Sequence, residues 1–122
     1  MKKIIIVLFL LFAATVVFAQ AIDLGAFPAG KWVDSKYNAT WEFSKNSIKV
    51  TDNKTGESFN FAGQIQNLKL VDGGRSGVGL TFSSSAAGRD YTVTPAAPPS
   101  LDLTMVIKRA GLPDATLTLK KQ

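Results

Sequence analysis

Residues 41–50, WEFSKNSIKV, decide the fold class of this chain. Apolar and polar residues alternate on both sides of its centre, first in WEF and again in IKV. Side chains along a strand point to opposite faces in turn, so each run has one face to bury and one to expose to water. Lys45 and Asn46, between the two runs, predict a tight hairpin. The stretch is therefore expected to form two antiparallel strands that share a buried face.

The same alternation continues to the C-terminus. Turn-forming residues separate the runs, as in Asp52 to Gly56, where Asn and Gly tolerate the left-handed backbone that a hairpin needs. This spacing predicts an all-β fold, an eight- to nine-stranded antiparallel up-and-down barrel. Almost no helix is expected beyond a turn near Asp23 to Ala29. The apolar residues on the predicted inward faces are Trp41 and Phe43, Ile48 and Val50, Phe59 and Phe61, Leu68 and Leu70, Leu80 and Phe82, Tyr91 and Val93, Leu103, Met105 and Ile107, and Leu117 and Leu119.

The N-terminus has the three parts of a secretory signal peptide. Two lysines follow Met1, an apolar run follows them, and Ala19-Gln20-Ala21 offers a small-x-small cleavage site. Cleavage after the first or the second alanine of this site fits equally. The alternative is a retained membrane anchor, but polar residues keep the strictly apolar stretches below the ~18 residues of a spanning helix. We therefore expect a signal peptide at residues 1–21 and one domain at residues 22–122.

The chain contains no cysteine, so no disulfide can stabilise the fold and no thiol can carry a lipid after the signal. A mature domain of about a hundred residues must then rely on its hydrophobic core. The predicted location is periplasmic or secreted. The polar outer faces of the strands leave no apolar band for a bilayer, which predicts a monomer with no membrane span after signal cleavage.

The charge of the chain is mild. Without Lys2 and Lys3, 12 basic residues remain against 9 acidic ones, a net charge of +3. The lysines are scattered over strand exteriors and turns, where solvated Lys also hinders edge pairing. A nucleic-acid groove needs clustered basic residues interleaved with exposed aromatic ones. Most aromatic residues here fall on the inward face, so we expect no nucleic acid as a partner.

The sequence also lacks histidine, which together with the lack of cysteine removes the commonest general base and the usual transition-metal ligands. Most acidic residues fall in predicted turns, and Glu42, Asp90 and Asp102 fall on outward strand positions. The glycine-rich stretch 73–77 lacks the Gly-Lys-Ser/Thr ending and the following helix of a phosphate loop. We therefore predict a non-enzymatic protein with no catalytic residue, no metal site and no cofactor.

Gly30-Lys31-Trp32 resembles the G-x-W signature that opens the first strand of lipocalins and related calycin barrels. A second aromatic strand, Trp41-Glu42-Phe43, follows closely, as in small bacterial secreted lipocalin-like domains. The resemblance implies that Gly30 and Trp32 form a structural signature, with the Trp packed across the closed end of the barrel. It also implies an arginine stacked on that ring, for which Arg109 is the nearest candidate and Arg89 the second.

Two functions remain open. The resemblance implies a binding module that takes a small apolar ligand at the barrel mouth. The residues that would line this mouth by position are Tyr37, Phe59, Tyr91 and Met105. The alternative is a protein-binding module, or an inhibitor of a secreted enzyme, that uses loops on a filled barrel. The inward positions hold mainly aromatic and leucine-sized residues, so we expect no pocket above about 300 Å³ except a shallow mouth near Tyr37 and residues 83–88.

Overall fold

The computed structural model describes residues 21–72, 77–84 and 88–122, and within these ranges it contains nine β-strands and no helix. The expected signal peptide lies outside the described residues, apart from Ala21. The strands are β1 (Gly30–Asp34), β2 (Ala39–Ser44), β3 (Ser47–Asp52), β4 (Ser58–Asn60), β5 (Ile65–Asp72), β6 (Val78–Ser84), β7 (Arg89–Pro95), β8 (Leu103–Arg109) and β9 (Leu112–Lys121).

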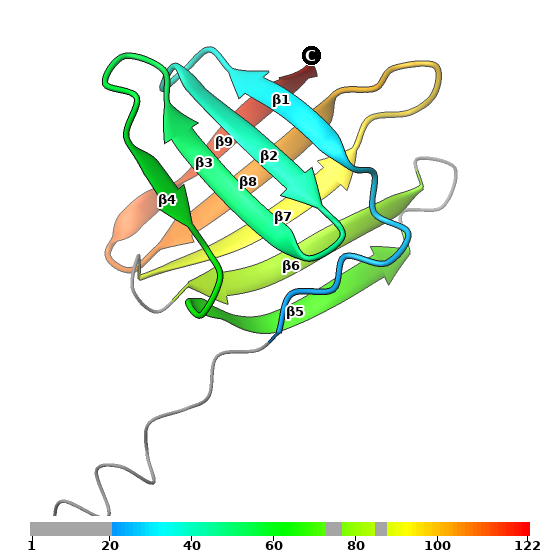
Figure 1. Ribbon diagram of the computed structural model, residues 1–122, viewed down its shortest axis with the longest axis horizontal. Helices are drawn as coiled ribbons and strands as arrows, with labels where there is room; N and C mark the ends of the chain where they lie inside the picture. Colours follow the sequence, from blue (N-terminus) through cyan, green and yellow to red (C-terminus); the bar gives the residue numbers. More distant parts are fainter. Residues whose placement is uncertain (1–20, 73–76, 85–87) are drawn as a thin grey trace, which may run out of the picture.

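All nine strands belong to one antiparallel sheet, in the order β4-β3-β2-β1-β9-β8-β7-β6-β5. The order follows the chain in both directions from the β1–β9 pair, which joins the first strand to the last. Figure 1 shows the sheet curled into a half-barrel, so that β2 and β3 face β7 and β8 across the interior. The all-β class and the antiparallel up-and-down order predicted from the sequence are confirmed.

The inner face of the curled sheet carries the hydrophobic core. On β8, Leu103, Met105 and Ile107 are at most 5% exposed, and the residues between them face outward. Trp41 on β2 reaches across the interior to Tyr91 on β7, with ring centroids 5.8 Å apart. Full burial of a large apolar side chain contributes about 1.5–3 kcal/mol, so this interior supplies the stability that disulfides cannot.

The predicted turns are where the sequence places them. The hairpin at Lys45 and Asn46 is confirmed by the pairing of β2 with β3, whose last register pair is Ser44 with Ser47. In the next turn, the Asp52 carboxylate accepts a hydrogen bond from the Lys54 backbone N–H at 2.8 Å. Gly56 closes this turn with a φ of +79°, a conformation that a residue without a Cβ adopts without strain. These turns set the register of β2, β3 and β4.

β5 contains an irregularity. Asn67 has a φ of +56°, and the pairing of β5 with β6 shifts register between Gln66 and Lys69. The extra residue of β5 is accommodated at this bulge, and beyond it Leu70 pairs with Leu80, which is 0% exposed. Directly paired residues share a face of the sheet, so Leu70 lies on the predicted inner face. It is 44% exposed because β5 is an edge strand.

β4 and β5 are consecutive in the chain but lie at the two edges of the sheet. No ladder pairs them in the described residues, and β4 has only three residues. We call the gap between these two edges the seam. Aromatic packing crosses it: the ring of Phe61, just after β4, lies 5.4 Å from that of Phe82 and 5.5 Å from that of Tyr91. The half-barrel is thus completed by side chains rather than by backbone hydrogen bonds.

Residues 21–29, the N-terminal segment, pack against another part of the seam (Figure 1). The Leu24 backbone N–H donates to the Lys45 carbonyl at 2.8 Å, which ties the segment to the β2–β3 turn. Gly25 lies against β5, where a Cβ would come within 2.8 Å of Leu70 Cδ1. The buried apolar side chains of the segment are Ile22, Leu24 and Phe27. The segment contains the expected turn and is part of the core.

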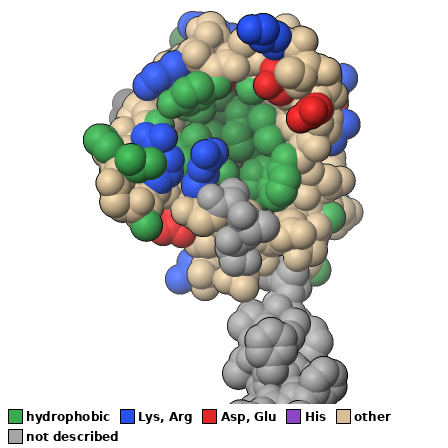
Figure 2. Space-filling model, turned by 90° about the vertical axis from the view of Figure 1, so that its left-hand side faces the viewer, with side chains coloured by type: hydrophobic (Ala, Val, Ile, Leu, Met, Phe, Trp, Pro, Cys, Tyr) green, Lys and Arg blue, Asp and Glu red, His purple; other side chains and the backbone are tan. Residues whose placement is uncertain are grey.

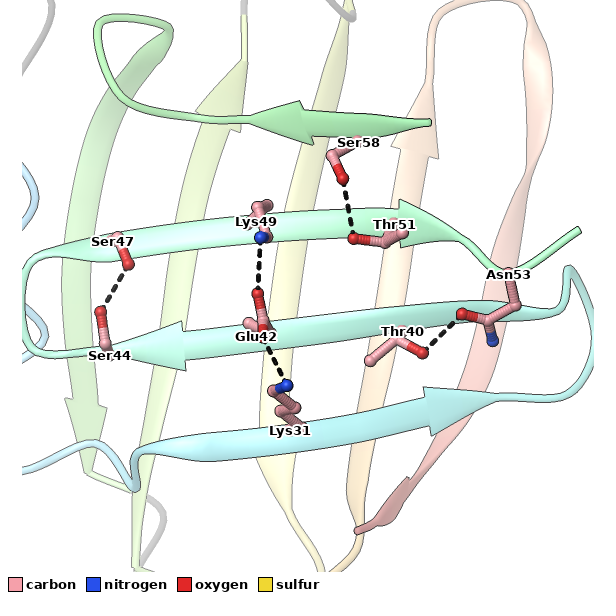
Figure 3. A network of polar contacts seen from close by, with 9 residues as sticks. All are labelled: Lys31, Thr40, Glu42, Ser44, Ser47, Lys49, Thr51, Asn53 and Ser58. Carbon is pink, nitrogen blue, oxygen red and sulfur yellow. Dashed lines mark hydrogen bonds and ion pairs between the residues drawn. The ribbon is translucent and has the colours of Figure 1, made fainter. Parts of the chain in front are cut away.

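Polar contacts join the outer faces of β1 to β4 (Figure 3). Glu42 lies between Lys31 and Lys49 in the strand register and forms ion pairs with both, at 3.1 and 3.0 Å. Hydrogen bonds from Lys49 and then Lys31 lower the pKa of the Glu42 carboxyl, and partial burial opposes them weakly. Exposed ion pairs contribute about 0–1 kcal/mol, so these contacts add little to stability. Their main effect is to keep this face of the sheet on the solvent side.

Candidate functional site

One end of the half-barrel is hollow. A cavity of about 470 Å³ opens among the ends of β1, β4 and β8 and the starts of β2, β7 and β9. We call it the mouth cavity. Figure 2 faces this end and shows an apolar hollow with basic side chains along part of its rim. Its lining residues are Asp34, Tyr37, Ala39, Trp41, Val50, Phe59, Phe61, Arg89, Tyr91, Ile107, Arg109, Ala115 and Leu117.

Three aromatic rings form the inner wall of the mouth cavity. Trp41 and Phe61 have ring centroids 5.8 Å apart, and Tyr91 lies 5.8 Å from the first and 5.5 Å from the second. Each of the three residues is at most 4% exposed. Trp41 and Tyr91 come from strands that face each other, so the wall is fixed by the curl of the sheet. Packed rings of this kind give a rigid apolar surface.

The loop after β1 forms one side of the rim. The Asp34 carboxylate is buried, 1% exposed, and accepts hydrogen bonds from the backbone N–H groups of Lys36 at 2.9 Å and Tyr37 at 3.2 Å. These bonds hold the turn and place the Tyr37 ring at the edge of the cavity, where it is 53% exposed. The Lys36 ammonium lies 5.7 Å from the centroid of that ring. Asp34 is thus occupied in holding the loop.

Two arginines form another side of the rim. Arg89 begins β7 and Arg109 ends β8, and the two are direct partners in the β7–β8 register. Arg109 Nη2 donates to the Pro113 carbonyl oxygen at 2.8 Å. Arg109 Nε is buried and has no hydrogen-bond partner among the described residues. The apolar cavity therefore has a cationic edge.

Tyr91 connects the aromatic wall to this edge. Burial raises the pKa of its phenol above the usual 10.0, and a hydrogen bond with the Arg89 side chain opposes part of that rise. At neutral pH the phenol is therefore protonated. Its hydroxyl is a neutral polar group at the boundary between the rings and the guanidinium groups.

The structure brings together three of the four residues expected at a barrel mouth. Tyr37, Phe59 and Tyr91 all line the mouth cavity. Met105 does not, because it is at the centre of β8 and 0% exposed. The hollow lies at the end where a shallow mouth was expected as the exception to a limit of about 300 Å³, and its volume is about 470 Å³. The large inward residues fill the middle of the interior, and this end stays open.

The residues of the G-x-W element lie elsewhere. Trp32 is 1% exposed, and its Nε1 donates to the Leu101 carbonyl at 2.8 Å. The cation over its ring is Lys121, at 5.0 Å from the centroid. Gly30 has a φ of +147°, and a Cβ there would meet Lys121 Nζ at 2.6 Å. Arg109, expected to stack on Trp32, instead lines the mouth cavity, because it is six residues along β8 from Leu103, which lies beside Trp32.

Sequence reasoning did not place Arg89 or Arg109 at the mouth. A signal for both is nevertheless present in the period of two. Arg89 continues the inward series of Tyr91 and Val93, and Arg109 continues the inward series that ends with Ile107. The paired register of the two strands then places the two arginines opposite each other on the same face. An arginine at an inward position near a strand end is thus the sequence pattern that indicates a residue on the rim of the mouth cavity.

Several acidic residues of the described chain hold turns or join neighbouring strands. Asp23 and Asp52 accept hydrogen bonds from backbone N–H groups in their own turns. Asp90 accepts a hydrogen bond from the Ser83 hydroxyl at 2.6 Å, and Asp102 forms an ion pair with Lys120 at 2.9 Å. In the ranges that the structure describes, no group of three or more potential ligands could hold a metal ion. No helix in those ranges is long and apolar enough to cross a membrane.

Comparison of the chain with protein-family models, with curated proteins and with solved structures finds no match. The function is therefore inferred from the residues of the mouth cavity.

Proposed function

We propose that this domain is a non-enzymatic, lipocalin-like binding module that takes a small molecule with an apolar body into the mouth cavity. The observation that carries the proposal is the cavity itself, about 470 Å³ in volume and walled by Trp41, Phe61 and Tyr91. Sites for small molecules typically measure ~300–1,000 Å³ and are lined mainly by apolar and aromatic side chains. The mouth cavity has both properties. A ligand there would remove apolar lining from water, at roughly 25 cal/mol per Å².

The lipocalin-like part of the proposal is supported by two features. Gly30-Lys31-Trp32 begins β1, as the G-x-W signature begins the first strand of lipocalins, and the strands run up and down around one core. Trp32 is buried with a cation over its ring, although that cation is Lys121 rather than an arginine. The G-x-W element and its buried tryptophan lie at the end of the barrel away from the mouth cavity.

The mouth cavity favours a small ligand over a protein-binding module that uses loops on a filled barrel. A filled barrel needs no hollow, whereas here Val50 and Phe59 are only partly covered at the cavity wall. The absence of histidine and cysteine from the sequence supports a non-enzymatic role. The signal-like residues 1–21 support a periplasmic or secreted location for the processed protein.

The test is titration of the purified protein with N-phenyl-1-naphthylamine, an uncharged probe whose fluorescence rises in apolar surroundings. We expect saturable one-to-one binding. Ala39 lines the mouth cavity, so Ala39→Phe fills part of it and should raise the Kd at least tenfold. The matched control is Ala62→Phe, at an exposed loop position outside the cavity, which should leave the Kd unchanged.

Circular dichroism verifies that both variants keep the β fold. Failure of the native protein to bind the probe saturably would overturn the proposal. Equal affinities of Ala39→Phe and Ala62→Phe would also overturn it, because the probe would then bind somewhere other than the mouth cavity.

A further inference from the structure

The mouth cavity has a polar neighbour. A second, more open hollow of about 510 Å³ lies beside it, and polar and charged residues line it. Arg89 and Arg109 line both hollows, so the two arginines lie on the boundary between an aromatic pocket and an open polar hollow. The other lining residues of this polar hollow include Gln66, Asn67, Ser83, Asp90 and Lys108.

The two arginines have no carboxylate to neutralise them. In the described part of the chain, neither forms an ion pair, and the nearby acids are engaged with other groups. Both oxygens of Asp34 accept backbone N–H groups of its own loop. Asp90 accepts the Ser83 hydroxyl and stands opposite Lys108 in the strand register. The positive charge at the boundary is therefore available to an outside anion.

Three observations favour an anion at the boundary. Arg89 and Arg109 are direct cross-strand partners, and like charges in that position repel each other. Arg109 Nε is buried without a partner, and its Nη2 has only a backbone carbonyl. A buried donor left unpaired destabilises a fold, since it has lost its water without gaining a bond. An anion between the two guanidinium groups would relieve the repulsion and accept the free donors.

We propose that the ligand is a single-chain amphiphile with an anionic headgroup, such as a medium-chain carboxylate. This inference rests on the proposed function and specifies its ligand class. The alkyl chain lies in the mouth cavity against Trp41, Phe61 and Tyr91. The headgroup lies at the boundary, where Arg89 and Arg109 donate charge-assisted hydrogen bonds and the polar hollow keeps one side in water. Guanidinium groups suit this task because their planar donors match the two oxygens of a carboxylate.

The experiment compares three ligands with the same ten-carbon chain: decanoate, decan-1-ol and decyltrimethylammonium. Each displaces N-phenyl-1-naphthylamine from the protein at low salt, below its aggregation concentration. We expect decanoate to bind at least tenfold more tightly than decan-1-ol, and the cationic amphiphile to bind most weakly. The advantage of decanoate should shrink as salt is added, because the rim is partly exposed.

Variants identify the groups responsible. Arg89→Gln and Arg109→Gln should each reduce the preference for decanoate over decan-1-ol at least fivefold, mainly by weakening decanoate binding. Arg109→Lys should keep part of the preference, since it retains the charge. Lys54→Gln removes one positive charge from an exposed turn outside both hollows and should leave the preference intact. Melting curves verify that each variant is folded.

The possible failures are distinct. If the probe and decan-1-ol bind but decanoate has no advantage, the anionic ligand class is wrong and the apolar binding site stands. A preference that survives both Arg→Gln variants would also overturn the inference, because the anion would then be held elsewhere. If neither the probe nor any of the three ligands binds, the proposed function and this inference both fail.

Discussion

Arg89 and Arg109 occupy strand positions that elsewhere in this protein hold apolar side chains. The period of two that buries Tyr91 and Ile107 continues by one more step in each strand and reaches an arginine. In the middle of the sheet an inward arginine would be buried without solvent, at a large cost. At the open end it reaches both the cavity and water. Position along the strand therefore decides whether an inward residue stabilises the core or forms a site.

Replacement of Trp32 by Ala should strongly destabilise the fold. The ring is 1% exposed, packs edge-on against Phe43 with centroids 5.7 Å apart, and donates to the Leu101 carbonyl. Loss of a buried aromatic side chain typically costs about 3–5 kcal/mol, and we expect that range in urea unfolding. Tyr37→Ala, at a ring that is 53% exposed, should cost under about 1 kcal/mol. Equal unfolding midpoints for the two variants would contradict the structural role of Trp32.

Tyr91 should make the protein sensitive to alkali. Below pH 10 the phenol is protonated in both the folded and the unfolded chain. As the pH rises past 10.0, the unfolded chain loses this proton first, because burial raises the pKa of the folded phenol. Stability present below pH 10 is then lost as the pH rises toward the folded pKa, by at most about 1.4 kcal/mol per pH unit from this one group.

The measurement is urea unfolding at several pH values between 8 and 11. Tyr91→Phe should flatten the decline above pH 10, since it removes the titrating group and keeps the ring. Tyr37→Phe, at the exposed ring on the rim, serves as the control and should retain the decline. A native-like decline in Tyr91→Phe would show that another group is responsible.

At the scale of elements, the N-terminal segment acts as a tenth element of the half-barrel beside the nine strands, although it is not itself a strand. Leu24 is 1% exposed and the segment is tied to the β2–β3 turn. We expect Leu24→Ala to lower the free energy of unfolding by about 2–5 kcal/mol, the usual cost of emptying a leucine site in a core. Leu112→Ala, at a residue that is 57% exposed, should change it by less than about 0.5 kcal/mol.

Urea unfolding monitored by circular dichroism distinguishes the two cases. A small effect of Leu24→Ala would mean that residues 21–29 only rest on the barrel surface.

The alternation of apolar residues predicts most of the strands because each strand has one wet face and one buried face. It does not predict how well each inner position is covered, as at Leu70, which shares a face with the buried Leu80 but lies on the edge strand β5 and is 44% exposed. It also does not predict the seam, since no short-range pattern indicates which strand pairs are missing. At the mouth, Tyr37 and Phe59 follow from their position near turns. The volume of the cavity does not, because it depends on how the sheet curls.

For the whole molecule, we expect one cooperative unfolding transition. One core contains inner-face side chains from both halves of the sheet and from the N-terminal segment, so no part can lose its packing alone. Far-UV circular dichroism and tryptophan fluorescence should give the same midpoint in urea, as two-state behaviour requires. The folded spectrum of the processed protein should be that of a β-protein. Separate midpoints would indicate that the halves on either side of the seam unfold independently.

The seam has a consequence for how this architecture can vary. In a fully closed barrel, strand number and shear fix the girth, so any change in capacity must alter the register of every strand. Here the chain between β4 and β5 is a tether with no ladder to preserve, and Ala62 and Gly63 on it are exposed. Inserted residues at that tether would let the two edges move apart while all eight strand pairings keep their register. The volume of the interior can therefore be changed one inserted residue at a time, in evolution or by protein engineering.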